Sequence, residues 1–270
     1  MGAAMIAATL TGLATGLGAL PFLFIRELPR RVYDGILGLG AGLMLAAATL
    51  GLLAEALAGV RPPGGPLDGA RLALVVAGFA VGVILAGAMD RLIPHRHARG
   101  HHQHLGHEPG HDHHDRAVEA TDDPRRGYAI IGALTIHRFP EGLAIGAGFA
   151  AGDHAHLGLL LAIAVGLQNA CEGIVMAAPL RKGGVAPGRS AIITTLTGLA
   201  TPLAAIVGGL LAGRTAPTMP FILALAAGTL IYITSNEIIP ESHSHGFEGT
   251  ASSGVVAGFL FTMVVGALLP

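Results

Sequence analysis

Eight long apolar stretches run through the chain, and they constrain its fold more than any other feature. They cover approximately residues 3–25, 32–59, 69–93, 127–151, 156–180, 188–213, 217–241 and 250–270. A helix needs about 20 apolar residues to cross the hydrocarbon core of a bilayer. Only helices and closed barrels satisfy their backbone polar groups in lipid. The sequence therefore predicts an all-α integral membrane protein with eight transmembrane helices in a bundle.

The composition agrees with this prediction and excludes several other classes of protein. Hydrophobic residues make up 52% of the 270 residues and charged residues only 12%, whereas soluble domains carry about 25% charged residues. The formal net charge of −1 gives no basis for a nucleic-acid partner. The single cysteine, Cys171, excludes an internal disulfide and a cysteine-rich zinc site.

Basic residues are distributed unequally between the connectors on the two sides of the predicted bundle. With the N-terminus outside the cell, the inner connectors hold twelve of the sixteen Lys and Arg residues and the outer connectors hold three. Basic connectors are retained in the cytoplasm, so we expect a multi-pass protein of the cell (inner) membrane with both termini outside. The Gly- and Ala-rich helix faces favour close helix packing and are also compatible with a homodimer.

One connector differs from the others in length and composition. Residues 94–126 are polar and cannot bury enough apolar surface to fold alone. We expect a disordered cytoplasmic loop inside a single transmembrane domain that spans residues 1–270. Closely spaced imidazoles bind transition metals weakly, which favours buffering or sensing of cytoplasmic metal over a few incidental weak sites. The nine histidines of the loop are His95, His97, His101, His102, His104, His107, His111, His113 and His114.

Two of the predicted membrane helices carry polar side chains near their middle. The fourth contains HRFPEG, in which His137 and Glu141 are four residues apart, and the fifth contains QNACEG, in which Gln168 and Glu172 have the same spacing. Residues at this spacing lie on one face of a helix. A charged side chain at the bilayer centre costs about 2.5–3.5 kcal/mol on insertion scales, and it therefore usually faces a cavity or a partner.

These four side chains form a ligand set for a divalent metal. One imidazole, two carboxylates and an amide oxygen suit Zn²⁺, and also Fe²⁺, Mn²⁺ or Cd²⁺. A lone histidine in a membrane helix is more often packed than metal-bound, but two matched pairs on consecutive antiparallel helices favour a metal site. Pro140 cannot donate a hydrogen bond to the carbonyl of Ile136, so it frees a polar backbone group beside these side chains.

HRFPEG followed about thirty residues later by QNACEG resembles the motifs of the fourth and fifth helices in the Zrt/Irt-like (ZIP) divalent-metal transporters, most closely those of bacteria. The segments MDRLIPHRH, TGLATP and SNEIIPESHSH lie where that family has counterparts, so the resemblance covers nearly the whole chain. It implies a ZIP-like bundle in which His137, Glu141, Gln168 and Glu172 bind metal between the fourth and fifth helices. It also implies that the metal, zinc first, is the substrate of an uptake transporter and that the protein is not an enzyme.

The sequence departs from the family pattern at the second metal of the family's binuclear site. The usual ligands are an Asn after the His, an acidic residue or Asn in the fifth helix, and a Glu before the proline of the sixth. Those positions hold Arg138, Asn169 and Thr201. A guanidinium cannot be deprotonated or bind a cation, and a mid-membrane Arg needs a counter-charge, for which Glu172 is the first choice. We therefore expect one bound metal, Arg138 in place of the second, and Asn169 as a polar wall residue. The alternative is that Arg138 turns away and reaches an interface.

Polar residues outside the two motifs are weaker candidates for the metal pathway. Glu237, with Asn236, would either line the path or form a simple hydrogen bond between helices. Asp90 lies near a span end, where an interfacial position is favoured. The residues predicted along the pathway or at its exit are Asn236, Glu237, Glu241, His243, His245 and Asp90.

Three functions remain compatible with these residues. An uptake transporter would follow the ion gradient or couple to protons, since the chain has no GxxxxGK[ST] loop for nucleotide hydrolysis. An intramembrane metal hydrolase would need an open water position and a base, but the chain has no HExxH motif and no spare carboxylate beyond the predicted ligands. A membrane metal sensor would depend mainly on the histidine loop. The transporter is the favoured interpretation.

Overall fold

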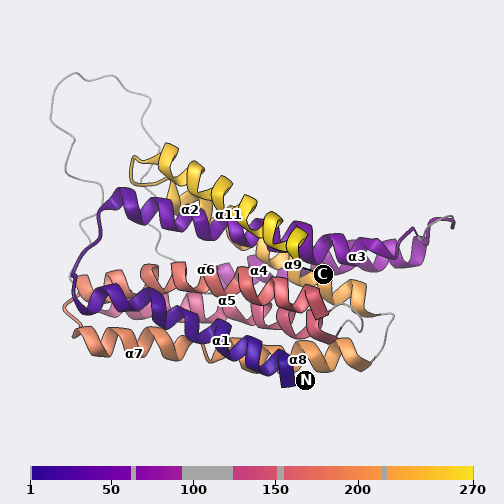
Figure 1. Cartoon of the computed structure of the whole chain (residues 1–270), viewed down its shortest axis with the longest axis horizontal. Coiled ribbons are helices and arrows are strands. Elements are labelled where there is room, and N and C mark those ends of the chain that lie inside the picture. Colours follow the sequence, from indigo (N-terminus) through magenta and orange to yellow (C-terminus); the bar gives the residue numbers. More distant parts are fainter. Residues whose placement is uncertain (1, 62–64, 93–123, 151–154, 215–217, 270) are drawn as a thin grey trace.

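The computed structural model describes residues 2–61, 65–92, 124–150, 155–214 and 218–269 (Figure 1). Within these residues the regular elements are all helical, and each predicted stretch corresponds to one helix or to a run of consecutive helical segments. The histidine loop and the side chain of Asp90 lie outside the part that the structure describes. The regulatory role expected of the loop and the interfacial position expected of Asp90 therefore stay predictions.

The helical segments follow the predicted stretches in order. The first three stretches form α1 (Gly2–Ala19) with the 3₁₀ turn η1 (Leu20–Leu23), then α2 (Arg30–Ala46) with the π-helix η2 (Ala47–Leu53) and α3 (Ala54–Ala58), then α4 (Gly69–Leu92). The fourth and fifth form α5 (Pro124–Ala150) and α6 (Ala155–Lys182), and the sixth forms α7 (Pro187–Thr197) and α8 (Ala200–Arg214). The last two form α9 (Met219–Ile233) with the π-helix η4 (Thr234–Ile238) and α10 (Ile239–Ser242), and α11 (Glu248–Leu268).

Seven helical stretches of the described chain are long and apolar enough to cross a membrane, and α5 is not one of them. This helix has 27 residues, which is ample length. Its apolar character is interrupted by His137, Arg138 and Glu141, which are the residues singled out from the sequence. The departure of α5 from the other seven therefore comes from the polar motif itself.

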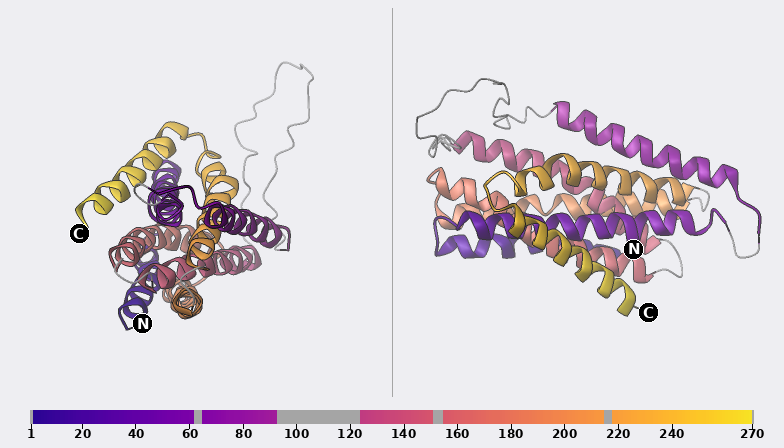
Figure 2. Two further views of the ribbon diagram at one scale, coloured as in Figure 1. Left: turned by 90° about the vertical axis from the view of Figure 1, so that its right-hand side faces the viewer. Right: turned by 90° about the horizontal axis from the view of Figure 1, so that it is seen from above.

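The helices pack in two groups. The first helix group consists of α1, α5, α6, α7 and α8, and the second consists of α2, α3, α4, α9, α10 and α11. The groups meet where α6 packs against α2 and where α5 packs against α9. Figure 2 shows this separation in the view along the helices, with α2 and α11 on one side and α1 and α8 on the other. The polar motifs of α5 and α6 thus lie on helices that contact both groups.

Glycines allow the closest helix contacts in the bundle. A Cβ atom at Gly142 or Gly146 of α5 would collide with the carbonyl oxygen of Thr201 or Ala205 in α8. Gly38 of α2 is held in the same way against Ala251 of α11. Small residues at helix interfaces permit this backbone approach where no hydrophobic effect drives association within lipid. The tight α5–α8 contact fixes the position of the polar motif on α5.

Candidate metal centre

The polar residues of α5 and α6 are buried together inside the bundle. On α5, His137, Arg138 and Glu141 are all buried, and the side chain of Arg138 has no exposed surface. On α6, Gln168 and Glu172 are buried as well. The two helices pack directly against each other, so the two polar motifs face one another as the sequence predicts.

Gln168 joins the two carboxylates of the predicted site. Its Nε2 donates hydrogen bonds to Oε1 of Glu141, at 3.0 Å, and to Oε1 of Glu172, at 2.6 Å. The partially positive amide hydrogens therefore lie between two acidic groups, where a cation would also be attracted. Gln168 thus contacts two of the other three predicted ligands.

Two buried oxygen atoms of this cluster have lone pairs that no described residue uses. Oε2 of Glu141 and Oε1 of Gln168 are both buried and accept no hydrogen bond from the described part of the chain. A buried acceptor without a partner costs about 1–3 kcal/mol. Ligation of a metal, or a hydrogen bond from water, would satisfy these atoms, and both atoms belong to predicted ligands.

The side chain of His137 has a contact outside the cluster of Glu141, Gln168 and Glu172. Its Nε2 lies 3.5 Å from Oε1 of Glu237, which belongs to η4 in the second helix group. Among the described residues, no group of three or more His, Cys, Asp and Glu side chains is close enough together to hold a metal ion. In this structure the imidazole thus contacts Glu237, while the amide of Gln168 bridges the two carboxylates of α5 and α6.

Arg138 forms an ion pair inside the bundle. Its Nη2 donates a hydrogen bond to Oε2 of Glu172 at 3.0 Å. Glu172 is therefore the counter-charge of Arg138, as expected. The alternative, in which the arginine turns away and reaches an interface, is wrong because the whole side chain is buried. Glu172 is shared, since one of its oxygens contacts Arg138 and the other contacts Gln168.

The residues at the two other second-metal positions, Asn169 and Thr201, are also buried. Asn169 donates from Nδ2 to the backbone oxygen of Thr11 at 3.1 Å, so it links α6 to α1. Thr201 lies in the first turn of α8, with its carbonyl oxygen against Gly142 of α5. Its hydroxyl has no hydrogen-bond partner within the described chain. Both residues are polar and uncharged, so neither adds negative charge beside Glu172, and the wall role expected of Asn169 stays a prediction.

The remaining pathway candidates occupy the end of the seventh stretch. Glu237 lies on the π-helix η4, an irregularity that is frequent at functional sites. Asn236 is exposed and, with Phe79 and Tyr232, lines an open hollow of about 360 Å³ between α4 and α9. Glu241, His243 and His245 follow at the turn before α11 and are partly exposed.

Sequence reasoning missed Asp34, which is completely buried near the start of α2. Its Oδ1 lies 2.7 Å from Nδ1 of His245, a residue 211 positions later in the chain. A carboxylate inside a predicted span is a signal that could have identified it. Its partner was not predictable, because the contact depends on how α2 and the turn before α11 come together.

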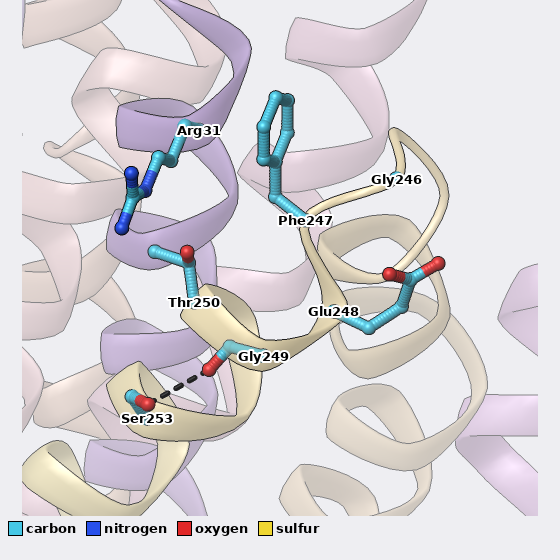
Figure 3. A pocket seen from close by; sticks show the side chains of 7 residues that line it. All are labelled: Arg31, Gly246, Phe247, Glu248, Gly249, Thr250 and Ser253. Carbon is cyan, nitrogen blue, oxygen red and sulfur yellow. Dashed lines mark hydrogen bonds between the residues drawn. The ribbon is translucent and has the colours of Figure 1, made fainter.

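A larger surface hollow, of about 480 Å³, lies beside the turn between α10 and α11. It is not at the buried carboxylates of Glu141 and Glu172. Figure 3 shows Arg31 of α2 next to Thr250, and Ser253 donating to the carbonyl oxygen of Gly249, at the start of α11. None of the predicted metal ligands lines it. The chemistry argued from the sequence therefore does not belong to this hollow.

The fold and the buried cluster define a class, a multi-pass helical membrane protein with polar side chains in its core. Comparison with known proteins gives the family. A model of the family described as "ZIP Zinc transporter" matches residues 94–266. The chain belongs to this family, whose members are transporters and not enzymes.

Bacterial relatives are similar to the chain over most of its length. The zinc transporter GufA of Myxococcus xanthus is 38% identical over 267 residues, which cover 98% of this chain and 98% of that protein. The zinc transporter ZIPB of Bordetella bronchiseptica is 36% identical over 256 residues, 95% of this chain and 78% of that protein. The zinc transporter ZupT of Akkermansia muciniphila is 32% identical over 260 residues. Membership of the family confirms the resemblance drawn from the two motifs.

Proposed function

We propose that the protein is an uptake transporter for a divalent transition metal, zinc first, and that it moves the ion into the cytoplasm through a mid-membrane site that holds one metal. The observation that carries this proposal is the contact of Gln168 with both Glu141 and Glu172 inside the bundle. The relatives named zinc transporters support the choice of zinc. Fe²⁺, Mn²⁺ and Cd²⁺ suit the same ligand types.

We expect side-chain rotations to convert this cluster into a metal site. A half-turn of the Gln168 amide exchanges its nitrogen for its oxygen, so that Oε1 faces the two carboxylates in place of the donor. Both carboxylates then contribute oxygens, and His137, on the same face of α5 as Glu141, supplies the imidazole after it leaves Glu237. These are neutral or anionic ligands of the kinds that zinc uses.

The charges around the site favour one divalent ion over two. With Glu141, Glu172 and Glu237 ionised, Arg138 reduces their combined charge to −2, which a single divalent cation neutralises. A second divalent ion would leave an uncompensated charge of +2 in a low-dielectric interior, where isolated charges are strongly disfavoured. Arg138 therefore acts as a fixed cation at the place of the second metal.

The two helix groups would move relative to each other during transport. Glu141, Gln168 and Glu172 belong to the first helix group, whereas Glu237 belongs to the second. Rocking of one group against another around a mid-membrane site is the common motion of secondary transporters. The contact between His137 and Glu237 crosses the boundary between the groups, so such a motion would break and re-form it.

The remaining proposals concern the whole chain in its membrane. The basic connectors favour an inner-membrane protein with both termini outside and the histidine loop in the cytoplasm, within one domain over residues 1–270. The histidine loop and the exit residues would then meet the metal on the same side. The small-residue helix faces remain compatible with a homodimer.

Purified protein in liposomes that contain a metal-sensitive dye tests this function. Wild-type protein should produce a zinc-dependent dye response, and Glu141→Ala or His137→Ala should abolish it. Glu248→Gln, which removes an exposed carboxylate outside the cluster, is a control that should keep the response. No response from the wild-type protein, or an undiminished response from Glu141→Ala, would contradict the proposal.

A further inference from the structure

Asp34 and His245 form a buried pair at the end of the bundle that we propose faces the cytoplasm. Asp34 has no exposed surface, and the side chain of His245 is 16% exposed. Their Oδ1 and Nδ1 atoms are 2.7 Å apart, and the ring of His245 packs edge-on against Tyr33. Gly246 follows with a φ of +86°, a conformation that favours glycine, and this turn folds His245 back onto α2.

The pair fixes which nitrogen of His245 carries the proton. An ionised carboxylate can only accept hydrogen bonds, so Nδ1 is the protonated nitrogen of the neutral ring and Nε2 keeps its lone pair. Nε2 makes no hydrogen bond to any residue that the structure describes. Oδ2 of Asp34 is likewise buried and unbonded within the described chain, so no other donor there competes with His245 for the carboxylate.

This arrangement is the one that proteins use behind metal-binding histidines. A ligating histidine almost always donates its other N–H to a carboxylate or carbonyl, which orients the ring and raises its basicity. The neighbouring His243 also has a carbonyl oxygen beside its Nδ1, but its Nε2 is already in contact with a hydroxyl group. Its Nδ1 lies 2.9 Å from the oxygen of Ile239 and from Oγ of Ser242, and its Nε2 lies 3.1 Å from Oγ of Ser252.

The position of His245 continues the line of acidic residues that leads away from the metal centre. Glu241 follows Glu237 by four residues, or about one helical turn, across the junction of η4 and α10. Tyr33, which packs against His245, lies within the electrostatic reach of both Glu241 and Asp34. An ion that leaves Glu237 along this face would therefore pass Glu241 before it meets the ring of His245.

We propose that Nε2 of His245 is a metal ligand at the exit of the pathway, downstream of Glu237 and Glu241, and that Asp34 is the positioning residue that holds the ring in its ligating tautomer. The inference rests on the proposed transport function. It also separates two histidines that the sequence treats alike, since His245 binds the departing ion and His243 has a structural role.

Zinc titration of ¹⁵N-imidazole-labelled protein tests the inference without depending on transport. The signal of His245 is assigned from the spectrum of His245→Gln. We expect Nδ1 to be protonated, Nε2 to shift as Zn²⁺ is added, and Asp34→Ala to weaken this zinc affinity by about 10- to 100-fold. Asp34→Asn keeps an acceptor oxygen without the charge, so its zinc affinity should lie between those of the wild-type protein and Asp34→Ala. This variant replaces Asp34→Ala in the test if Asp34→Ala does not fold.

The control is His243→Asn, which should leave the zinc-dependent shift of His245 in place. A proton on Nε2, no shift of His245 with zinc, or an unchanged affinity in both Asp34 variants would overturn the inference. Flux in liposomes separates the two proposals. A wild-type protein without zinc flux refutes transport, whereas normal flux with no zinc shift at His245 refutes the exit ligand alone.

Discussion

Arg138 is the residue that we expect at the place of the family's second metal. Its guanidinium is fully buried beside Glu172, and both Nε and Nη1 have no hydrogen-bond partner in the described chain. Removing one member of a buried ion pair costs about 3–5 kcal/mol, because the other charge is left uncompensated. The arginine is therefore a structural partner of Glu172 and, in the one-metal site that we propose, a barrier to a second cation.

Replacing the arginine should admit a second metal. In Arg138→Asn the fixed charge is lost, an amide oxygen becomes available, and one oxygen of Glu172 is released. We expect the zinc content of purified protein to rise from one to two ions per chain, or the preference among divalent ions to change, as measured by mass spectrometry of bound metals. Arg138→Lys keeps the charge and should keep one ion. An unchanged count and an unchanged preference in Arg138→Asn would count against the role given to Arg138.

At the scale of the elements, the position of the motif depends on the close contact between α5 and α8. A Cβ atom at Gly146 would collide with the carbonyl oxygen of Ala205, whereas a Cβ atom at Gly132, on the same helix, would meet no atom within 4 Å. The two glycines thus offer a matched comparison. Overpacking of a tight contact costs about 1–3 kcal/mol, whereas alanine at an open helical site is favoured over glycine by up to about 1 kcal/mol.

We expect Gly146→Ala to lower the thermal stability of the purified protein in detergent and Gly132→Ala to preserve or raise it. The cause is the backbone of α8, which a methyl group at position 146 would displace. Unfolding followed by circular dichroism gives both transition temperatures. Equal transition temperatures for the two variants would show that the α5–α8 contact is not as tight as described.

The helices were predictable from the sequence and the long-range contacts were not. Apolar stretches of about 20 residues located the helices, because lipid imposes a minimum apolar length on each, and α5 was located too although its polar motif keeps it below the hydropathy of the other seven. The spacing of four residues placed Glu141 with His137 and Gln168 with Glu172, because helical periodicity is local. The contacts of His137 with Glu237 and of Asp34 with His245 depend on how separate helices pack, which no local pattern encodes.

At the scale of the whole molecule, the proposed metal centre lies where the two helix groups meet, and the histidine loop joins the groups in sequence between α4 and α5. The cluster that we propose binds the metal draws its ligands from α5 and α6, with Glu237 on η4. No residue of the loop contributes to it in this proposal. The loop is therefore expected to regulate transport and not to form the pathway.

Deletion of residues 95–114 tests this division of roles. We expect zinc flux in liposomes to remain largely intact and its response to zinc on the cytoplasmic side to change, because weak imidazole sites are removed while the buried cluster is kept. A scrambled polar segment of the same length without histidine is the control for loop length. Complete loss of flux in both variants would contradict the proposed pathway.

The central claim is that one metal ion binds between the side chains that α5 and α6 direct toward each other. Anomalous diffraction from zinc-soaked crystals tests it most directly, since it reports the identity, number and position of bound ions together. The account predicts one strong mid-membrane peak about 2.0–2.2 Å from oxygens of Glu141, Gln168 and Glu172. Two peaks on either side of Glu172, or a mid-membrane peak out of reach of these three residues, would contradict it.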